Sequence, residues 1–268
     1  MDLGAQVTPI FNPALRSVNV EGLPELPDSW TWVHLPDLGF MNRGTSRHRP
    51  RNAPHLYGGN YPFIQTGDVA RSGGRIVAHE QTYNAAGLAQ SRLWPAGTVC
   101  VTIAANIADS ALLTYPACFP DSIVGIIADP RFSLGEYLEY FIRTARNDLA
   151  QFAPATAQAN INIAILNDVA VPTPPVEEQN EIVRRVDALF KLAGKIEGRV
   201  AGATKRADKL TQGILGRAFR GELVPTEAEL ARHDGRDYEA AAVLLERIKS
   251  EREKTPPSRN GARKISQS

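Results

Sequence analysis

The chain has 268 residues, which is long enough for one sizeable domain with extensions. Its 30 basic and 29 acidic side chains leave a formal net charge of only +1, so overall charge does not indicate a nucleic-acid binder. No run approaches about 18 apolar residues, and no basic start precedes an apolar stretch at the N-terminus. We therefore expect neither a membrane span nor a secretory signal, and a cytoplasmic location.

The charge is distributed unevenly along the chain. Residues 1–170 hold 11 Arg, no Lys and 14 acidic side chains, whereas the rest of the chain holds 19 basic and 15 acidic side chains. The first part is therefore mildly acidic, and it would have to concentrate positive charge locally in order to bind phosphate.

The N-terminal residues predict an irregular leader followed by the first strand of a globular domain. Pro and Asn punctuate the leader, residues 1–23. Within residues 26–39, Trp30 and Trp32 stand one strand period apart, so we expect a strand whose aromatic side chains are anchored in the core.

Residues 41–59 are the densest basic stretch of the first part and show neither a helical nor a strand period. The stretch offers six candidate DNA contacts: Arg43, Thr45, Ser46, Arg47, Arg49 and Arg51. Arginine can form paired hydrogen bonds with guanine or phosphate, and hydroxyl groups can donate to backbone oxygens. The alternative interpretation is a solvated surface loop that binds nothing.

Residues 61–69 predict a strand that ends in a glycine turn. Gln65 and Asp68 lie at the polar end of this segment, where they could present side chains to a ligand. A capped β-turn explains the same residues without any ligand.

The next segments predict a sheet covered by a helix. Residues 98–115 read as two apolar strands around a turn that contains Asn106, a further candidate contact, and residues 122–129 read as another short strand. Residues 133–152 have an amphipathic pattern, which predicts a helix packed on the sheet.

Residues 156–175 close this globular part and are expected to be extended. The side-chain amides of Gln158 and Asn160 stand on alternate positions, so they would point to one face, either to satisfy a buried turn or to contact nucleic acid. Pro172, Pro174 and Pro175 are expected to stop the strand.

An apolar seam runs through residues 177–221 with the 3-4 spacing of a coiled coil. The seam consists of Ile182, Val186, Leu189, Ala193, Ile196, Val200, Ala203, Ala207, Leu210 and Ile214. A continuous helix of this length would be about 66 Å long and would need a partner to bury its seam. Gly221 marks the expected end of the helix.

The last part of the chain predicts one short helix and a tail. Residues 237–252 place Leu244, Leu245 and Ile248 on one helical face, and residues 255–268 are expected to be disordered.

Several chemistries are not indicated by the sequence. There is no P-loop, no glycine-rich strand-to-helix loop for a methyl-donor cofactor and no base-methylation motif. No Cys/His cluster has zinc spacing, and Cys100 and Cys118 are expected to be buried free thiols. We therefore expect a chain without cofactors that catalyses nothing by itself.

Seven segments together resemble the DNA-specificity (S) subunits of type I restriction-modification systems. They are LPDSWTWVHL (26–35), NRGTS (42–46), YPFIQTGDV (61–69), ANIADSAL (105–112), CFPDSIVGI (118–126), residues 157–190 and LTQGILGRAFRGELVP (210–225). The resemblance covers roughly residues 24–252, and it is most specific where Pro-Pro-X-X-Glu-Gln leads into a long helix. Two positions depart from the family pattern: Ser29 and Ala108 stand where glycine is common, and Ala108 could alter its turn because alanine resists positive φ.

The resemblance implies an α/β (α+β) target recognition domain at residues 24–175, followed by a long coiled-coil-type helix at residues 176–221 and a region with a short helix at residues 222–254. It implies double-stranded DNA as a partner, with methyltransferase (M) subunits and, through them, motor/nuclease (R) subunits. Usual members carry two such heads, so this chain looks like a half-subunit that could form a homodimer with two-fold symmetry. The alternative is a coiled-coil interaction protein or decoy that binds restriction-complex subunits without reading DNA.

Overall fold

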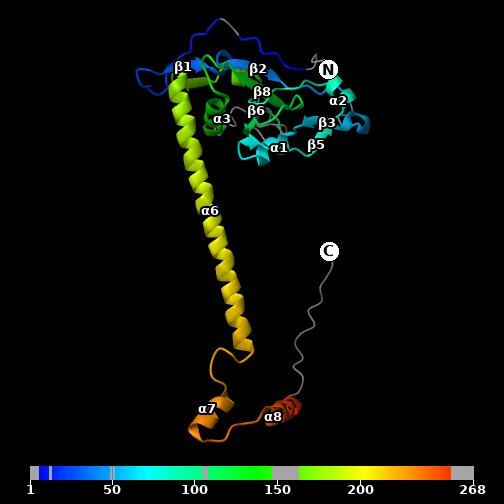
Figure 1. Ribbon diagram of the computed structural model, residues 1–268, viewed down its shortest axis with the longest axis vertical. Coiled ribbons are helices and arrows are strands. Elements are labelled where there is room, and N and C mark those ends of the chain that lie inside the picture. Colours follow the sequence, from blue (N-terminus) through cyan, green and yellow to red (C-terminus); the bar gives the residue numbers. More distant parts are fainter. Residues whose placement is uncertain are drawn as a thin grey trace. The chain divides into compact units, whose positions relative to one another are not determined.

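The computed structural model describes residues 6–11, 14–48, 50, 52–104, 108–146 and 163–254. The chain divides into two compact units, Met1–Lys191 and Leu192–Ser268. The first unit contains all the strands of the described residues, and the second unit is helical (Figure 1). The fold is thus a mixed α/β domain joined to helices, as the sequence predicts.

A five-stranded sheet forms the centre of the first unit. Its strands, in spatial order, are β2 (Gly39–Arg43), β8 (Ile123–Ala128), β6 (Val99–Thr102), β7 (Ser110–Leu113) and β4 (Arg75–Ile76). All neighbours are antiparallel except β4 and β7, which are parallel. The amphipathic helix α3 (Gly135–Thr144) contacts β6, β7 and β8, so the predicted helix on the sheet is confirmed, as are the strands predicted around residues 98–115 and 122–129.

Two small ribbons and several short helices complete the first unit. One ribbon pairs β1 (Thr31–His34) with β9 (Ala170–Thr173), and the other pairs β3 (Tyr57–Phe63) with β5 (Gln81–Tyr83). The short helices are η1 (Leu35–Asp37), η2 (Pro54–Leu56), α1 (Thr66–Arg71), α2 (Ala85–Ala89) and α5 (Ile163–Asn167). Because β1 and β9 pair, the two ends of the globular domain meet where the long helix begins.

The aromatic core is built around a tryptophan that no sequence pattern had singled out. Trp94 is fully buried and stacks on Phe119 with ring centroids 4.9 Å apart. A Cβ at Gly125 would lie 2.6 Å from the Trp94 ring, so this strand position has room only for glycine. The prediction that Trp30 and Trp32 are anchored in the core is wrong, because both are only partly buried, Trp32 in β1 and Trp30 directly before it.

Three segments differ from their predicted conformation. In residues 41–59, β2 extends to Arg43, η2 covers Pro54–Leu56 and β3 begins at Tyr57, so the stretch contains regular structure that the sequence did not predict. Residues 61–69 do not end in a glycine turn but enter α1. In residues 156–175 the described part forms α5 before β9, and Pro172 lies inside β9, which tolerates proline because a two-stranded ribbon has free edges.

Ala108 occupies the backbone conformation that alanine was expected to resist. Its φ is +58°, and its N–H donates to the Thr102 carbonyl oxygen over 2.9 Å. A left-handed conformation costs an L-residue about 1–2 kcal/mol. The turn is held despite this cost by the Thr102 contacts on both sides, since the Thr102 hydroxyl also accepts from the Asp109 N–H over 3.1 Å.

The long helix α6 (Val176–Phe219) begins after Pro174 and Pro175, and its root is fixed to the head by buried polar contacts. Gln179 is fully buried; its side-chain oxygen accepts from the Leu134 N–H, and its amide donates to the carbonyl oxygens of Phe132 and Pro174. This glutamine therefore has all its hydrogen-bonding groups satisfied by the head.

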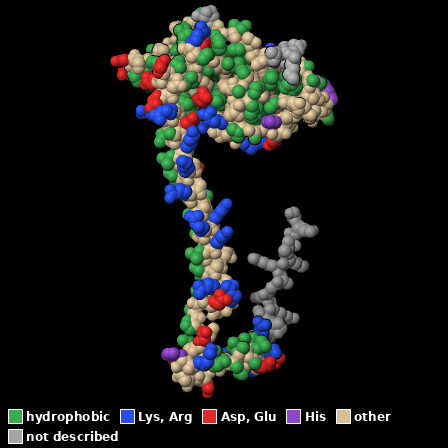
Figure 2. Space-filling model, viewed as in Figure 1, with side chains coloured by type: hydrophobic (Ala, Val, Ile, Leu, Met, Phe, Trp, Pro, Cys, Tyr) green, Lys and Arg blue, Asp and Glu red, His purple; other side chains and the backbone are tan. Residues whose placement is uncertain are grey.

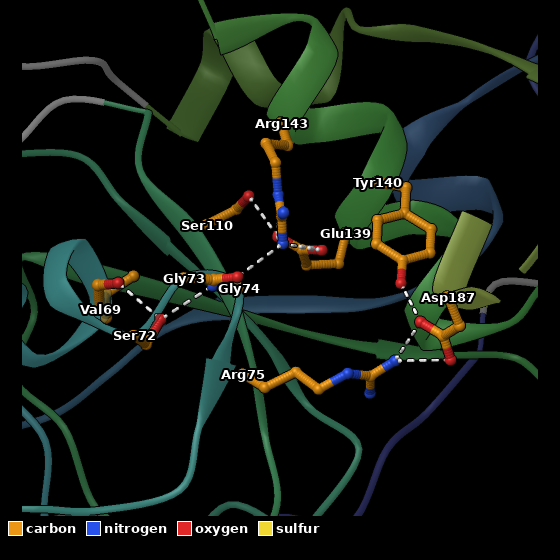
Figure 3. Close-up of polar contacts among 10 residues, drawn as sticks. All are labelled: Val69, Ser72, Gly73, Gly74, Arg75, Ser110, Glu139, Tyr140, Arg143 and Asp187. Carbon is orange, nitrogen blue, oxygen red and sulfur yellow. Dashed lines mark hydrogen bonds and ion pairs between the residues drawn. The ribbon is translucent and has the colours of Figure 1, made fainter. Parts of the chain in front are cut away.

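A second set of contacts lies about two helical turns beyond Gln179 (Figure 3). Asp187 of α6 accepts hydrogen bonds from Tyr140 of α3 and from Arg75 of β4, the latter over 3.2 Å. The bond from Tyr140 and the cation of Arg75 hold the pKa of Asp187 below its usual range, although burial acts in the opposite direction. The carboxylate thus stays charged and ties α6 to two elements of the head.

In the second unit, α6 is followed by α7 (Glu227–Asp234) and α8 (Ala241–Lys254). Gly221 has φ +72°, which agrees with its predicted role at the helix end. The helix α8 matches the predicted short helix, but α7 was not predicted. The sequence nevertheless contains a start and a stop signal for α7: Thr226 and Glu229 form a capping box, and Gly235 ends the helix at φ +65°.

Both cysteines are free and buried, as the sequence predicts. Burial raises the pKa of the Cys118 thiol to about 11 and also raises that of Cys100. A thiol is nucleophilic only as its thiolate, so both side chains are chemically quiet at neutral pH.

Among the described helices, none is both long enough and apolar enough to cross a membrane.

Alanine substitutions at two glycines of α6 are expected to stabilise the helix. A Cβ at Gly194 or Gly213 meets nothing within 4 Å, so alanine adds no clash. Glycine costs a helix interior about 1 kcal/mol relative to alanine, and the Gly194→Ala/Gly213→Ala variant should gain helicity accordingly. Thermal melting followed by circular dichroism measures this gain, and Gly125→Ala, which meets Trp94, serves as the contrasting variant that should melt earlier.

Candidate nucleic-acid interface

The middle of the basic stretch is held against the end of helix α2. The Ser91 hydroxyl donates to the Thr45 carbonyl oxygen over 2.6 Å, and the Arg47 N–H donates to the Gln90 carbonyl oxygen over 3.3 Å. The His48 N–H donates to the Gln90 side-chain oxygen over 2.9 Å. Residues 44–48 therefore lie beside residues 90–92, although more than 40 residues separate them in the sequence.

Gly44 makes this close packing possible at the end of β2. A Cβ at this position would lie 2.4 Å from the carbonyl oxygens of Phe119 and Pro120. Larger residues would push the segment away from the residues that it contacts. The glycine therefore helps to fix the positions of the arginines on either side of it, Arg43 and Arg47.

Ion pairs divide the arginines that precede α6 into two groups. Six of the nine described arginines there have a carboxylate oxygen within 4.0 Å: Arg16, Arg71, Arg75, Arg131, Arg143 and Arg146. Among the described residues, the three without such a partner are Arg43, Arg47 and Arg92. All three are exposed. Their positive charge is available for an external anion, unlike that of the other six.

Two of these uncompensated arginines line the same depression. It has a volume of about 860 Å³, and its wall includes Arg47, Arg92, Tyr61, Phe40 and Gln6. The wall combines two guanidinium groups, a phenol, a side-chain amide and aromatic surface. Such a set can bind phosphate through the arginines and stack against or hydrogen-bond with a base edge.

Three other predicted DNA contacts, Ser46, Gln65 and Asp68, form hydrogen bonds within the fold. Ser46 is only 4% exposed, and its hydroxyl lies 3.2 Å from the Tyr83 hydroxyl, so it serves the interior. Gln65 and Asp68 cap helix α1: the Gln65 N–H donates to the Asp68 carboxylate over 2.8 Å, and Arg71 pairs with the same carboxylate. The ligand-free interpretation of these two residues, a capped turn, is close to the structure, although the cap begins a helix.

Five further candidates lie outside the described residues: Arg49, Arg51, Asn106, Gln158 and Asn160. Thr45 is half-buried and belongs to the segment held by Ser91.

Arg92 could not be found from the sequence because it stands alone there. Tertiary contacts of Gln90 and Ser91 with residues 45–48 bring it to the depression that Arg47 lines. No local signal marks such a residue, since charge density along the chain does not report proximity in space.

The seam of α6 forms a second candidate surface. Ile182 packs against the core of the head, and Val186 is partly buried. From Leu189 onward, the large seam residues are exposed by 44–65%: Leu189, Ile196, Val200, Leu210 and Ile214. The seam alanines, Ala193, Ala203 and Ala207, are exposed as well. An apolar stripe of this length on one helix is typical of an interaction surface.

No group of His, Cys, Asp or Glu side chains in the described part of the chain could hold a metal ion.

The family described as the type I restriction modification DNA specificity domain matches residues 27–200, and the chain belongs to this family. The specificity subunit of the type I restriction enzyme EcoDI from Escherichia coli is 30% identical over 262 residues, which cover 91% of this chain and 54% of that protein. The EcoKI specificity subunit from Escherichia coli strain K12 is 42% identical over 127 residues, 45% of this chain and 26% of that protein. The chain thus spans about half the length of the EcoDI subunit.

Solved structures agree with this assignment at the level of the fold. A chain of a type I R-M system superposes with a TM-score of 0.63 at 21% identity, covering 75% of this chain and 48% of that chain. The HsdS subunit from Thermoanaerobacter tengcongensis superposes with a TM-score of 0.56 at 22% identity and the same coverage. The mixed α/β head with its long helix is therefore the fold of type I specificity subunits.

Proposed function

We propose that this chain is a DNA-recognition subunit of a type I restriction-modification complex and that its head reads one half of a bipartite site. The single observation that carries the proposal is the convergence of Arg47 and Arg92, both without carboxylate partners among the described residues, on one depression of a domain from this family. A mildly acidic head in which two of the three uncompensated arginines of the described residues line one depression has the local positive charge that phosphate binding requires.

The helical part is proposed to assemble the complex. The exposed seam of α6 would pair with a second copy of this chain or with helices of methyltransferase subunits, and motor/nuclease subunits would join through the latter. In this proposal the chain contributes recognition and assembly, and the partners contribute catalysis. Two copies related by a two-fold axis would then present two heads to a palindromic, interrupted site.

Replacement of Arg47 and Arg92 by alanine is expected to weaken DNA binding of the assembled complex and to flatten its salt dependence. Each phosphate that is no longer neutralised lowers the slope of log affinity against log salt by about 0.9, so the slope of the double variant should fall by up to about 2. Fluorescence anisotropy with target and random duplexes over a salt series measures both effects.

Arg71→Ala is the matched control, because Arg71 is already paired with Asp68 and Glu80. It should leave affinity and slope nearly unchanged. Unchanged retention of the Arg47/Arg92 variant across the salt series would show that the depression is not the DNA site. Co-purification of wild-type chain with methyltransferase subunits but without a DNA footprint would instead support a decoy.

A further inference from the structure

The part of α6 in the second unit has two distinct faces. At 3.6 residues per turn, the seam residues from Ile196 to Ile214 fall in an arc of about 80° around the helix axis. The six Lys and Arg residues of this part of α6 fall in a separate arc of about 120°. They are Lys195, Arg199, Lys205, Arg206, Lys209 and Arg217. Figure 2 shows Lys and Arg side chains projecting along α6.

The face with the cations has an unusual composition. Between residues 194 and 217, an arc of about 140° contains only Lys, Arg, Gly and a single Gln. Its glycines are Gly194, Gly198, Gly202, Gly213 and Gly216. The two carboxylates of the segment, Glu197 and Asp208, lie outside this arc. We call this surface the cation–glycine face.

The cations of this face are not compensated by ion pairs. Within the part of the chain that the structure describes, none of the six has a carboxylate oxygen within 4.0 Å. Helix α8 of the same unit differs: Arg247 pairs with Glu239, Lys249 with Glu246, and Lys254 with Glu251. A helix surface that only needs solvation intersperses both signs, as α8 does.

The glycines leave the helix backbone bare between the cations. At Gly194, Gly198 and Gly213 a Cβ would meet nothing within 4 Å, so no packing within the described chain requires glycine there. A shallow groove of about 470 Å³ lies where this face borders the seam: Gly198, Gly202, Arg199 and Arg206 line it together with the seam residues Ile196, Val200 and Ala203. Each glycine weakens the helix by about 1 kcal/mol, and an external partner that approaches the backbone closely would account for that cost.

We propose that the cation–glycine face contacts the sugar-phosphate backbone of duplex DNA without reading its sequence. The inference rests on the proposed function, which makes DNA the ligand of this chain. Charge complementarity favours DNA over an acidic protein surface, because protein interfaces are centred on apolar and aromatic anchors and are depleted in lysine. The face has no such anchor, whereas lysine and arginine are the usual phosphate contacts. The seam stays available for helices, so the two faces of α6 serve different partners.

The test uses the full-length Lys205→Gln/Arg206→Gln/Lys209→Gln variant, since glutamine keeps a helix propensity close to that of lysine. Binding to a fluorescein-labelled random-sequence duplex is measured by anisotropy over a salt series. Removing three phosphate-binding cations should lower the slope of log affinity against log salt by about 2–3. The matched control, Arg247→Gln/Lys249→Gln/Lys254→Gln, removes three paired cations from α8 and should leave the slope unchanged.

The outcomes separate this inference from the proposed function. The α6 variant should lose affinity for target and random duplexes by the same factor, so that the preference for target is kept. An unchanged slope, with helicity intact by circular dichroism, overturns the inference while wild-type binding still supports the proposed function. Loss of methyltransferase co-purification without a change in slope also overturns it, because the face would then bind protein. A wild-type chain that shows no salt-dependent duplex binding, alone or assembled with its partners, overturns the proposed function itself.

Discussion

An Arg143→Ala variant is expected to lose about 2–3 kcal/mol of unfolding free energy at neutral pH, since removing one member of a buried ion pair leaves the other charge uncompensated. The Glu139 side chain is only 3% exposed, and Arg143 donates to its two carboxylate oxygens over 2.9 and 2.8 Å. The exposure of Arg143 itself moderates the loss, as does the Ser110 hydroxyl, which still donates to Glu139 over 3.1 Å.

The loss is expected to depend on pH. Burial raises the pKa of Glu139, and the bonds from Arg143 and Ser110 act against that rise. Without Arg143 the folded-state pKa should rise further above the unfolded-state value. A carboxyl group with a raised folded-state pKa binds protons more readily in the folded state, so stability falls as pH rises between the two values. The unfolding free energy that the Arg143→Ala variant loses should therefore be smallest in acid, and this stability deficit should reach its full value above the raised pKa.

Denaturant titrations across a pH series measure this deficit. The Glu139→Gln/Arg143→Met variant removes both charges and should recover most of the lost stability, because no uncompensated charge remains. Equal stabilities of Arg143→Ala and wild type at neutral pH would show that Glu139 needs no cation.

The Val200→Glu/Leu210→Glu variant is expected to abolish self-association of the chain through α6. These seam residues are 59% and 65% exposed in the single chain. A two-fold dimer would bury both residues of each copy, and burying a Val or Leu side chain contributes about 1.5–3 kcal/mol. Loss of four such side chains removes at least about 6 kcal/mol, which raises the dissociation constant more than about 10⁴-fold.

Sedimentation equilibrium of the purified chain measures the change. Leu215→Glu is the matched control, because Leu215 is 47% exposed but lies off the seam. It should leave self-association intact. A wild-type chain that stays monomeric at every concentration, or a seam variant that still dimerises, would contradict pairing of α6 with a second copy of the chain.

The long helix could be predicted from the sequence because its determinants are local. The 3-4 spacing of its apolar residues predicts a continuous helix, and Pro175 and Gly221 mark its two ends. The structure places α6 at Val176–Phe219, within two residues of the predicted bounds at either end. The same reasoning gave the strands β6, β7 and β8, whose apolar runs are short and bounded by turns.

The core could not be predicted as well, since burial is decided by tertiary packing. Trp30 and Trp32 had the strand period expected of core residues, yet β1 belongs to a two-stranded ribbon that leaves both partly exposed. Trp94 had no periodic neighbour, and it is buried because Phe119 and Gly125 form its site from other parts of the chain. A sequence pattern reports which residues could be buried, and the packing decides which ones are.

In the candidate site too, local sequence could predict some features, whereas others depend on tertiary packing. Charge density drew attention to the segment around Arg47, but it could not separate the exposed arginine from the buried Ser46 beside it. Arg92 joins the depression only through contacts that span the sequence between α2 and β2. Local propensity also explains why Gln65 and Asp68 resembled a ligand site, because helix caps use the same polar residue types.

The two inert thiols make the chain a convenient scaffold for site-directed spectroscopic labels. Cys100 and Cys118 are inaccessible and protonated at neutral pH, so a maleimide dye should react only with a cysteine introduced at an exposed position. Energy transfer between dyes placed on α6 of two copies would report whether and in which orientation the helices pair. No native residue would have to be removed beforehand.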